Sequence, residues 1–214
     1  MKRWQELLAI AVKLLRDKNF YNFTFGGGTA LAARYNHRNS KDVDIFLPDA
    51  QILTYLTPRL NADAENVSDN YSEASNFIKL NIGEQEIDFI LAPNITGVAP
   101  KKMVFEHIDV YVDAPEEIIA KKLLYRAESL KVRDIYDTAV VLANGVELAS
   151  HCAVFMAKIP AIEKRIEDIA LQYTDELGRL DLINPEKYPK SLNVFQAFIS
   201  ECKSKFPFPK YPSV

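Results

Sequence analysis

A glycine-rich turn that precedes a strand bearing two carboxylates is the feature that most constrains how this chain can fold. The turn is Gly26-Gly27-Gly28-Thr29, and the strand begins Asp42-Val43-Asp44-Ile45-Phe46. Because side chains alternate along a strand, Asp42 and Asp44 are expected on one face, while the apolar residues pack inside. Two like charges on one face repel, and burial increases that cost. A divalent cation is the expected compensation, and carboxylate oxygens suit Mg²⁺, with Mn²⁺ as the alternative.

The glycines themselves predict a phosphate-binding turn. Backbone N–H groups of such a turn, with the N-terminus of the helix that follows, attract an anion, and the missing side chains let phosphate approach. We therefore expect the phosphates of a nucleoside triphosphate at Gly27, Gly28 and Thr29, whose hydroxyl can add a donor. Arg38 and Ser40 flank the carboxylate strand and are further candidates for phosphate contact. Without the carboxylates, the glycines would equally suit a plain strand-to-helix turn.

A third carboxylate comes from a predicted hairpin. Apolar alternation over 77–82 and 86–91, around Gly83-Glu84-Gln85, indicates two strands, and Asp88 alternates with the apolar residues of the second. If that strand lies beside 42–47, three carboxylates converge and can hold two Mg²⁺ ions. The alternatives are that Asp88 is an ordinary acid on an exposed strand face and that Asp42 caps the strand or pairs with a neighbouring cation.

Composition narrows the class of protein. The chain has 214 residues, 48% of them hydrophobic, which is enough for a packed core and argues against global disorder. A net charge of −3 indicates no overall attraction to nucleic acid. No apolar run is long enough for a membrane span, and no signal peptide is apparent. We expect a cytoplasmic protein without zinc, in which Cys152 and Cys202 are reduced.

The pattern predicts an α+β fold with a small mixed sheet over 1–114 and a helical region over 115–214. Pro115, followed by two glutamates, marks the change because these residues suit a first helical turn. Residues 61–75 read as irregular, and the tail from Phe206 reads as extended. The remaining predicted elements are helices at 3–18, 29–35, 48–60, 115–130, 133–143, 146–158, 161–176 and 190–205, and strands at 22–26, 42–47, 77–82, 86–91 and 107–112.

Four segments together resemble a known family. They are Gly-Gly-Gly-Thr-Ala-Leu-Ala from Gly26, Arg-Asn-Ser-Lys-Asp-Val-Asp-Ile-Phe from Arg38, Glu-Glu-Ile-Ile-Ala-Lys-Lys-Leu from Glu116, and Lys-Val-Arg-Asp-Ile-Tyr-Asp from Lys131. Over about residues 20–145 the chain resembles the AbiEii/AbiGii-type nucleotidyltransferase toxins, a branch of the polymerase-β-like superfamily. The resemblance implies a nucleotidyltransferase core, with the helical region completing the active-site cleft.

The family pattern also has a helical lysine followed by an Arg-Asp-x-x-Asp segment. Its spacing matches Lys122 rather than Lys121, and the resemblance implies that Lys122 contacts the nucleotide. A helical wheel agrees, since Lys122 and Arg126 border the apolar stripe, as do Ser129 and Arg133, whereas Lys121 and Glu128 fall on the side expected to be solvated. The functional acid downstream is Asp134 or Asp137. Asp134 is favoured because it follows the arginine directly, although an acid there also suits a helix start.

These observations predict a Mg²⁺-dependent enzyme that transfers a nucleotide from an NTP to a hydroxyl acceptor and releases pyrophosphate. Asp42, Asp44 and Asp88 would bind metal, and Lys122 and Asp134 complete the catalytic set, with Ser40 and Arg126 among the nucleotide contacts. The resemblance implies a toxin of a toxin–antitoxin or phage-defence pair, with RNA, specifically tRNA, as acceptor and an antitoxin protein as partner. The alternatives are a small-molecule acceptor, as in antibiotic nucleotidyltransferases, and an inactive nucleotide sensor.

Overall fold

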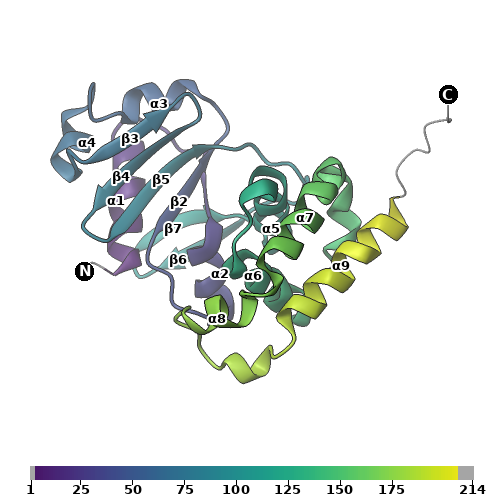
Figure 1. The fold of residues 1–214 in the computed structure, drawn as a ribbon. Helices are drawn as coiled ribbons and strands as arrows, with labels where there is room; N and C mark the ends of the chain where they lie inside the picture. The colour runs from purple at the N-terminus through teal and green to yellow at the C-terminus, as the bar shows by residue number, and fades with distance from the viewer. Residues whose placement is uncertain (1–2, 207–214) are drawn as a thin grey trace. The chain divides into compact units, whose positions relative to one another are not determined.

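The computed structural model describes residues 3–206, and its contacts divide the chain into two compact units, Met1–Ala114 and Pro115–Val214. Each unit buries its own set of apolar side chains. The first unit contains the sheet and the second is helical (Figure 1). No helix within 3–206 is long and apolar enough to cross a membrane.

The first unit is built on one seven-stranded mixed sheet with the strand order β3-β4-β5-β2-β1-β7-β6. At its centre β2 runs antiparallel to β1 and parallel to β5, while β1 runs parallel to β7. The outer pairs β3–β4, β4–β5 and β6–β7 are antiparallel. The strands are β1 Thr24–Gly26, β2 Val43–Leu47, β3 Tyr71–Ala74, β4 Phe77–Ile82, β5 Gln85–Leu91, β6 Lys101–Phe105 and β7 Ile108–Val112.

One face of this sheet is packed and the other carries the polar residues. Helix α1 (Trp4–Arg16) lies behind the sheet in Figure 1 and packs on β2, β5 and β7. Strand β2 alternates, with Val43, Ile45 and Leu47 fully buried and Asp44 on the opposite face. The same alternation in β5 buries Ile87 and Phe89 and leaves Asp88 on the face of Asp44. Asp44 and Asp88 therefore lie on the face away from α1.

Short helices complete the first unit. Helix α2 (Gly27–Tyr35) starts at the glycine turn and ends at Asn36, which adopts the left-handed conformation that asparagine tolerates at helix ends. Helix α3 is shorter than the predicted 48–60 and spans only Gln51–Leu56. It packs near β4.

The region 61–75, predicted to be irregular, contains helix α4 (Ala62–Val67) and strand β3. Asn61 caps α4, because its side-chain oxygen accepts hydrogen bonds from the backbone N–H groups of Asp63 at 2.9 Å and Ala64 at 3.4 Å. β3 and the equally missed β6 are the two edge strands. Edge strands are solvated on more sides, so they lack the apolar alternation from which strands are predicted.

The second unit is helical, as predicted, but several of its helices are shorter than predicted and one is of another type. The predicted helix 115–130 ends at Tyr125, 146–158 is a 3-10 helix, and 161–176 is two helices. The elements are α5 Pro115–Tyr125, a 3-10 turn Ala127–Ser129, α6 Val132–Ala143, the 3-10 helix Ala149–Lys158, α7 Ile159–Ala170, α8 Tyr173–Gly178, a 3-10 turn Pro185–Lys187 and α9 Ser191–Lys205. Except for Phe206, the predicted extended tail lies outside the described residues.

The prediction of reduced cysteines is wrong in this structure. Cys152, on the 3-10 helix, and Cys202, near the end of α9, form a disulfide with their Cα atoms 5.6 Å apart. They are 50 residues apart in sequence, and only the packing of α9 against the 3-10 helix brings them together. Both are fully buried.

Candidate active site

A row of residues at one register crosses four neighbouring strands of the first unit. Gly26 of β1 pairs with Asp44 of β2, Asp44 pairs with Asp88 of β5, and Asp88 pairs with Lys79 of β4. Directly paired residues project from the same face of a sheet and lie close together. The strand of Asp88 therefore lies beside the strand of Asp44, which is the arrangement that a convergence of carboxylates requires.

The glycine turn is shaped around two of the charged side chains. Gly27 has φ +66°, and a Cβ atom there would lie 1.7 Å from Asp44 Oδ2. A Cβ atom on Gly28 would lie 2.3 Å from Arg38 Nη2. The Asp44 carboxylate and the Arg38 guanidinium thus both lie against the backbone of this turn, and only glycine leaves room for them there. The turn joins β1 to α2, so the N-terminus of α2 is placed beside Asp44.

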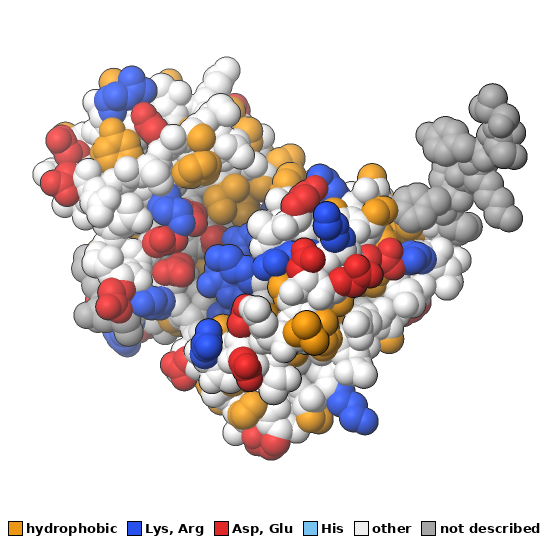
Figure 2. All heavy atoms as spheres, viewed as in Figure 1, with side chains coloured by type: hydrophobic (Ala, Val, Ile, Leu, Met, Phe, Trp, Pro, Cys, Tyr) orange, Lys and Arg blue, Asp and Glu red, His pale blue; other side chains and the backbone are white. Residues whose placement is uncertain are grey.

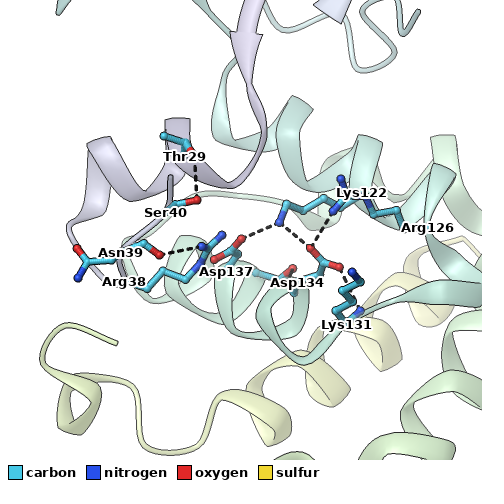
Figure 3. Close-up of polar contacts among 10 residues, drawn as sticks. Thr29, Arg38, Asn39, Ser40, Lys122, Arg126, Lys131, Asp134 and Asp137 are labelled. Carbon is cyan, nitrogen blue, oxygen red and sulfur yellow. Dashed lines mark hydrogen bonds and ion pairs between the residues drawn. The ribbon is translucent and has the colours of Figure 1, made fainter. Parts of the chain in front are cut away.

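Thr29 and Ser40 lie in the same region but are engaged with each other. Thr29 is buried, and its hydroxyl is 2.8 Å from the Ser40 hydroxyl (Figure 3). The Thr29 hydroxyl also donates to the backbone carbonyl of Asp42. These bonds fasten the first turn of α2 to the residues that lead into β2. Their geometry fits the positioning of the turn more directly than a contact with phosphate.

Asp42 lies one residue before β2, and its carboxylate points toward the start of β5. Asp42 Oδ1 accepts a hydrogen bond of 3.2 Å from the backbone N–H of Glu86. The nearby Gln85 Nε2 donates to the Lys41 carbonyl at 3.1 Å, which ties the same two segments together. Asp42 therefore helps to hold β5 beside β2.

Asp88 is the carboxylate whose surroundings disfavour its charge most clearly. Burial, followed by the neighbouring charge of Asp44, raises the pKa of Asp88 from 3.8 to about 6, although Lys79 opposes the rise. Lys79 Nζ is 3.3 Å from Asp88 Oδ2 and also pairs with Glu86. The other oxygen, Asp88 Oδ1, is buried and has no hydrogen-bond partner among residues 3–206.

The structure assembles two of the three predicted metal ligands. Within residues 3–206 no group of three or more His, Cys, Asp or Glu side chains is close enough together to hold a metal ion. Asp44 and Asp88 are paired across β2 and β5, whereas Asp42 is turned to the Glu86 backbone. The donor set still fits a divalent cation, because Asp88 Oδ1 has no partner within the described part of the chain and a second carboxylate lies beside it.

In the second unit, a buried ionic cluster joins α5 to α6. Lys122 Nζ contacts Asp134 Oδ1 at 2.7 Å and Asp137 Oδ2 at 2.6 Å (Figure 3). Both carboxylates are fully buried, and Lys122 is nearly so. Arg126 Nη1 lies 3.6 Å from Asp134 Oδ1. Both acids of the Arg-Asp-x-x-Asp segment therefore face the predicted lysine.

Asp134 has a second role at the start of α6. Its Oδ2 accepts a 3.1 Å hydrogen bond from the backbone N–H of Lys131, which precedes the helix. Burial disfavours the charge of Asp134, but the cations of Lys122 and Arg126 outweigh it and lower the pKa of the carboxyl. The cluster and the helix start thus use the same carboxylate, so the helix-start interpretation of Asp134 is confirmed, while its functional role stays a prediction.

The expectation that Lys121 is solvated is wrong. Lys121 is buried and lies 3.3 Å from Glu117, which is fully buried one turn earlier in α5. The helical wheel failed because α5 is buried around most of its circumference, so it has no single apolar stripe. Glu128 is exposed, as predicted, and pairs with Lys158.

Two residues that border the carboxylate pair, Lys79 and Glu86, were not among the site residues predicted from the sequence. Alternation on 77–82 places Lys79 on the polar face, but its contact with Asp88 depends on the register of β4 on β5. Opposite charges in a predicted hairpin are the signal that could have found the pair, because residues directly opposite on one face interact.

The comparisons with known proteins place this geometry in a family. A family model described as nucleotidyl transferase AbiEii toxin, type IV TA system, matches residues 10–207. No curated protein gives a significant match.

Three solved structures are similar in fold. The nucleotidyltransferase toxin MenT4 from Mycobacterium tuberculosis has 14% identity and a TM-score of 0.55, covering 92% of this chain and 82% of its own. ANT(2")-Ia, in complex with adenylyl-2"-tobramycin, has 18% identity and a TM-score of 0.51 over 72% of this chain and 95% of its own. JHP933 from Helicobacter pylori has 15% identity and a TM-score of 0.51 over 94% of this chain and 92% of its own.

Proposed function

This chain belongs to the AbiEii family of nucleotidyltransferase toxins, and from that premise we propose that it transfers a nucleotide from an NTP to a hydroxyl of RNA, with tRNA as the favoured acceptor. The observation that carries the proposal is the pairing of Asp44 with Asp88 beside the Gly27 turn, where Asp88 Oδ1 has no hydrogen-bond partner from residues 3–206. The nucleotidyltransferase fold of the solved neighbours agrees with it.

In the proposed reaction the acceptor hydroxyl oxygen bonds to the α-phosphorus of the NTP. The bond from that phosphorus to the oxygen bridging the α- and β-phosphates breaks, and pyrophosphate leaves. Asp88 accepts the hydroxyl proton, as a carboxylate whose Oδ1 has no hydrogen-bond partner among residues 3–206. Backbone N–H groups at Gly27 and Gly28 hold the phosphates. Arg38, which lies against Gly28, offsets their charge.

Asp44 and Asp88 are the residues that would hold Mg²⁺ or Mn²⁺. Such an ion supplies neutralisation of the triphosphate and a lower pKa for the attacking hydroxyl. Asp42 joins them as a third ligand only if its carboxylate leaves the Glu86 N–H. The catalytic roles of Lys122 and Asp134 stay predictions of the family resemblance, and the nucleotide contacts of Thr29, Ser40 and Arg126 stay predictions from the sequence pattern.

The toxin family favours RNA as acceptor, and its description as a toxin–antitoxin system implies an antitoxin that counters this chain. A small-molecule acceptor is the second candidate, because the structure of ANT(2")-Ia, which is similar in fold, contains adenylyl-2"-tobramycin. Its identity of 18% supports the fold but not the substrate.

Purified protein incubated with each α-³²P-labelled NTP, Mg²⁺ and total RNA tests the proposal. We expect label in tRNA-sized RNA, abolished by Asp44→Asn and Asp88→Asn and by chelation of the metal. Asp109→Asn is the matched control, since Asp109 is an acid on β7 that pairs with Lys102 at 2.9 Å. A parallel reaction contains aminoglycosides in place of RNA. Label in the aminoglycosides rather than in RNA would favour a small-molecule acceptor. Metal-independent NTP binding that survives Asp44→Ala, without transfer to any acceptor, would indicate a sensor.

A further inference from the structure

Lys79 lies beside Asp88, one of the two carboxylates that would hold the metal ion. It occupies the next position after Asp88 in the row across the sheet, and its ammonium lies 3.3 Å from Asp88 Oδ2. Among residues 3–206, Lys79 is the cation that pairs with Asp88. On this face, basic and acidic side chains lie next to one another over β4 and β5 (Figure 2).

Glu86 gives Lys79 a second partner on the same strand as Asp88. Both carboxylates project from the same face of the sheet as Lys79 on β4, and the Lys79 ammonium contacts both. Lys79 can therefore release Asp88 without becoming an unpaired charge. The side chains of Lys79 and Glu86 are 29% and 38% exposed, so this movement keeps them partly in water, whereas the side chain of Asp88 is 16% exposed.

We propose that Lys79 is a built-in counter-ion that competes with the divalent metal for Asp88 and so weakens metal binding by the free enzyme. The inference rests on the proposed function, which makes Asp44 and Asp88 metal ligands. Without metal, Lys79 offsets the repulsion between these two carboxylates. When metal binds, Lys79 retains Glu86. Lys79 is a positioning residue, since it acts on the site through Asp88.

The test is Mn²⁺ binding to the nucleotide-free protein, measured by electron paramagnetic resonance of the free ion. Lys79→Met is expected to tighten binding about tenfold, the equivalent of one weak charge-assisted hydrogen bond. Mn²⁺ should also raise the melting temperature of Lys79→Met more than that of the wild type, because the ligand binds only the folded state. Lys102→Met is the matched control, which removes a lysine from an ion pair on β6 and leaves Asp88 untouched.

A charge-balanced variant separates competition from general electrostatics. Lys79→Met with Glu86→Gln removes one positive and one negative charge, so long-range attraction for Mn²⁺ is nearly unchanged. It also avoids leaving Glu86 as a second carboxylate without its cation, which limits any fold defect of the single variant. Competition predicts that the double variant keeps the tighter binding of Lys79→Met. A return to wild-type affinity would overturn the inference.

The outcomes distinguish this inference from the proposed function. Mn²⁺ binding that depends on Asp44 but is equal or weaker in Lys79→Met overturns the role of Lys79 and leaves the function standing. Absence of Asp44-dependent Mn²⁺ binding in the wild type and in both variants removes the metal site itself, and with it both proposals. Asp44-dependent binding seen only in the Lys79 variants supports competition in its strongest form.

Discussion

The side chain of Asp44 fills the space that a side chain at Gly27 would need, and the site depends on that fit. The left-handed backbone of Gly27 and the close approach of Asp44 Oδ2 each exclude a side chain, for separate reasons. Asp44 in turn stands beside Asp88, whose pKa it helps to raise. At the scale of single residues, the site therefore combines a backbone constraint with an electrostatic one.

Gly27→Ala should destabilise the protein by about 2–4 kcal/mol, of which about 1 kcal/mol is the positive φ and the rest is displacement of Asp44. Activity should fall to background, because Asp44 cannot keep its place. Urea unfolding and the transfer assay measure the two effects. Gly83→Ala is the control, with φ +64° and nothing within 4 Å of the added Cβ atom. Equal losses in the two variants would show that the clash with Asp44 is unimportant.

The raised pKa of Asp88 predicts how the stability of the metal-free protein depends on pH. Its pKa is raised in the folded state from 3.8 to about 6, so the folded protein holds this proton more tightly than the unfolded chain. The contribution of Asp88 to the free energy of unfolding is therefore fully present below about pH 4 and is lost as pH rises through 6. The penalty at pH 7 is on the order of 3 kcal/mol at most.

Asp88→Asn should remove this penalty. In urea unfolding with a chelator present, the variant should be more stable than the wild type at pH 7, and the difference should disappear near pH 3.5. The same variant should lose transferase activity. A difference that does not change with pH would mean that Asp88 does not titrate in this range.

At the scale of elements, α5 and α6 are joined by charge as well as by apolar packing. Lys122 on α5 reaches two fully buried carboxylates that lie one turn apart on α6. Buried ions are costly unless they are paired, so each member of the cluster depends on the others. This gives the helix pair a defined register.

Lys122→Met should destabilise the protein by about 3–5 kcal/mol, because it leaves two buried carboxylates without their main cation. Thermal unfolding measures the loss. Adding Asp134→Asn and Asp137→Asn should recover much of it, since no uncompensated charge then remains. Lys158→Met removes an exposed pair with Glu128 and should cost less than about 1 kcal/mol. A small loss in Lys122→Met with full loss of activity would instead point to a role confined to the nucleotide.

At the scale of the whole molecule, the chain forms two units that differ in how they are held together. The first relies on a sheet with its apolar face packed by α1, and the second on helices with a disulfide between the 3-10 helix Ala149–Lys158 and α9. The disulfide closes a loop of 50 residues within the second unit. Its effect on stability should therefore be local to that unit.

Reduction of the disulfide, or Cys152→Ser with Cys202→Ser, should cost up to about 4 kcal/mol of stability by the loop-entropy estimate. Hydrogen exchange should show the loss of protection in α9 and its neighbours, while the sheet strands β2 and β5 keep theirs. Metal binding at Asp44 should be unchanged. Faster exchange throughout both units would contradict a local effect.

Much of the fold followed from local patterns. Apolar alternation located β2, β4 and β5, the glycines located the turn into α2, and Pro115 with its glutamates located the start of α5. These features are local because backbone geometry and burial periodicity act over a few residues. The edge strands β3 and β6 were not predicted, because their exposure to solvent removes that periodicity.

The sequence by itself determined which chemical groups the site can use: a glycine turn, strand carboxylates, and a lysine with two acids on the helices. Only the tertiary structure decided their partners. It set Asp44 beside Asp88, brought Lys79 to both Asp88 and Glu86, turned Asp42 to a backbone N–H, and buried Lys121. The physical reason is that strand register and burial depend on contacts between distant residues, which no local pattern encodes.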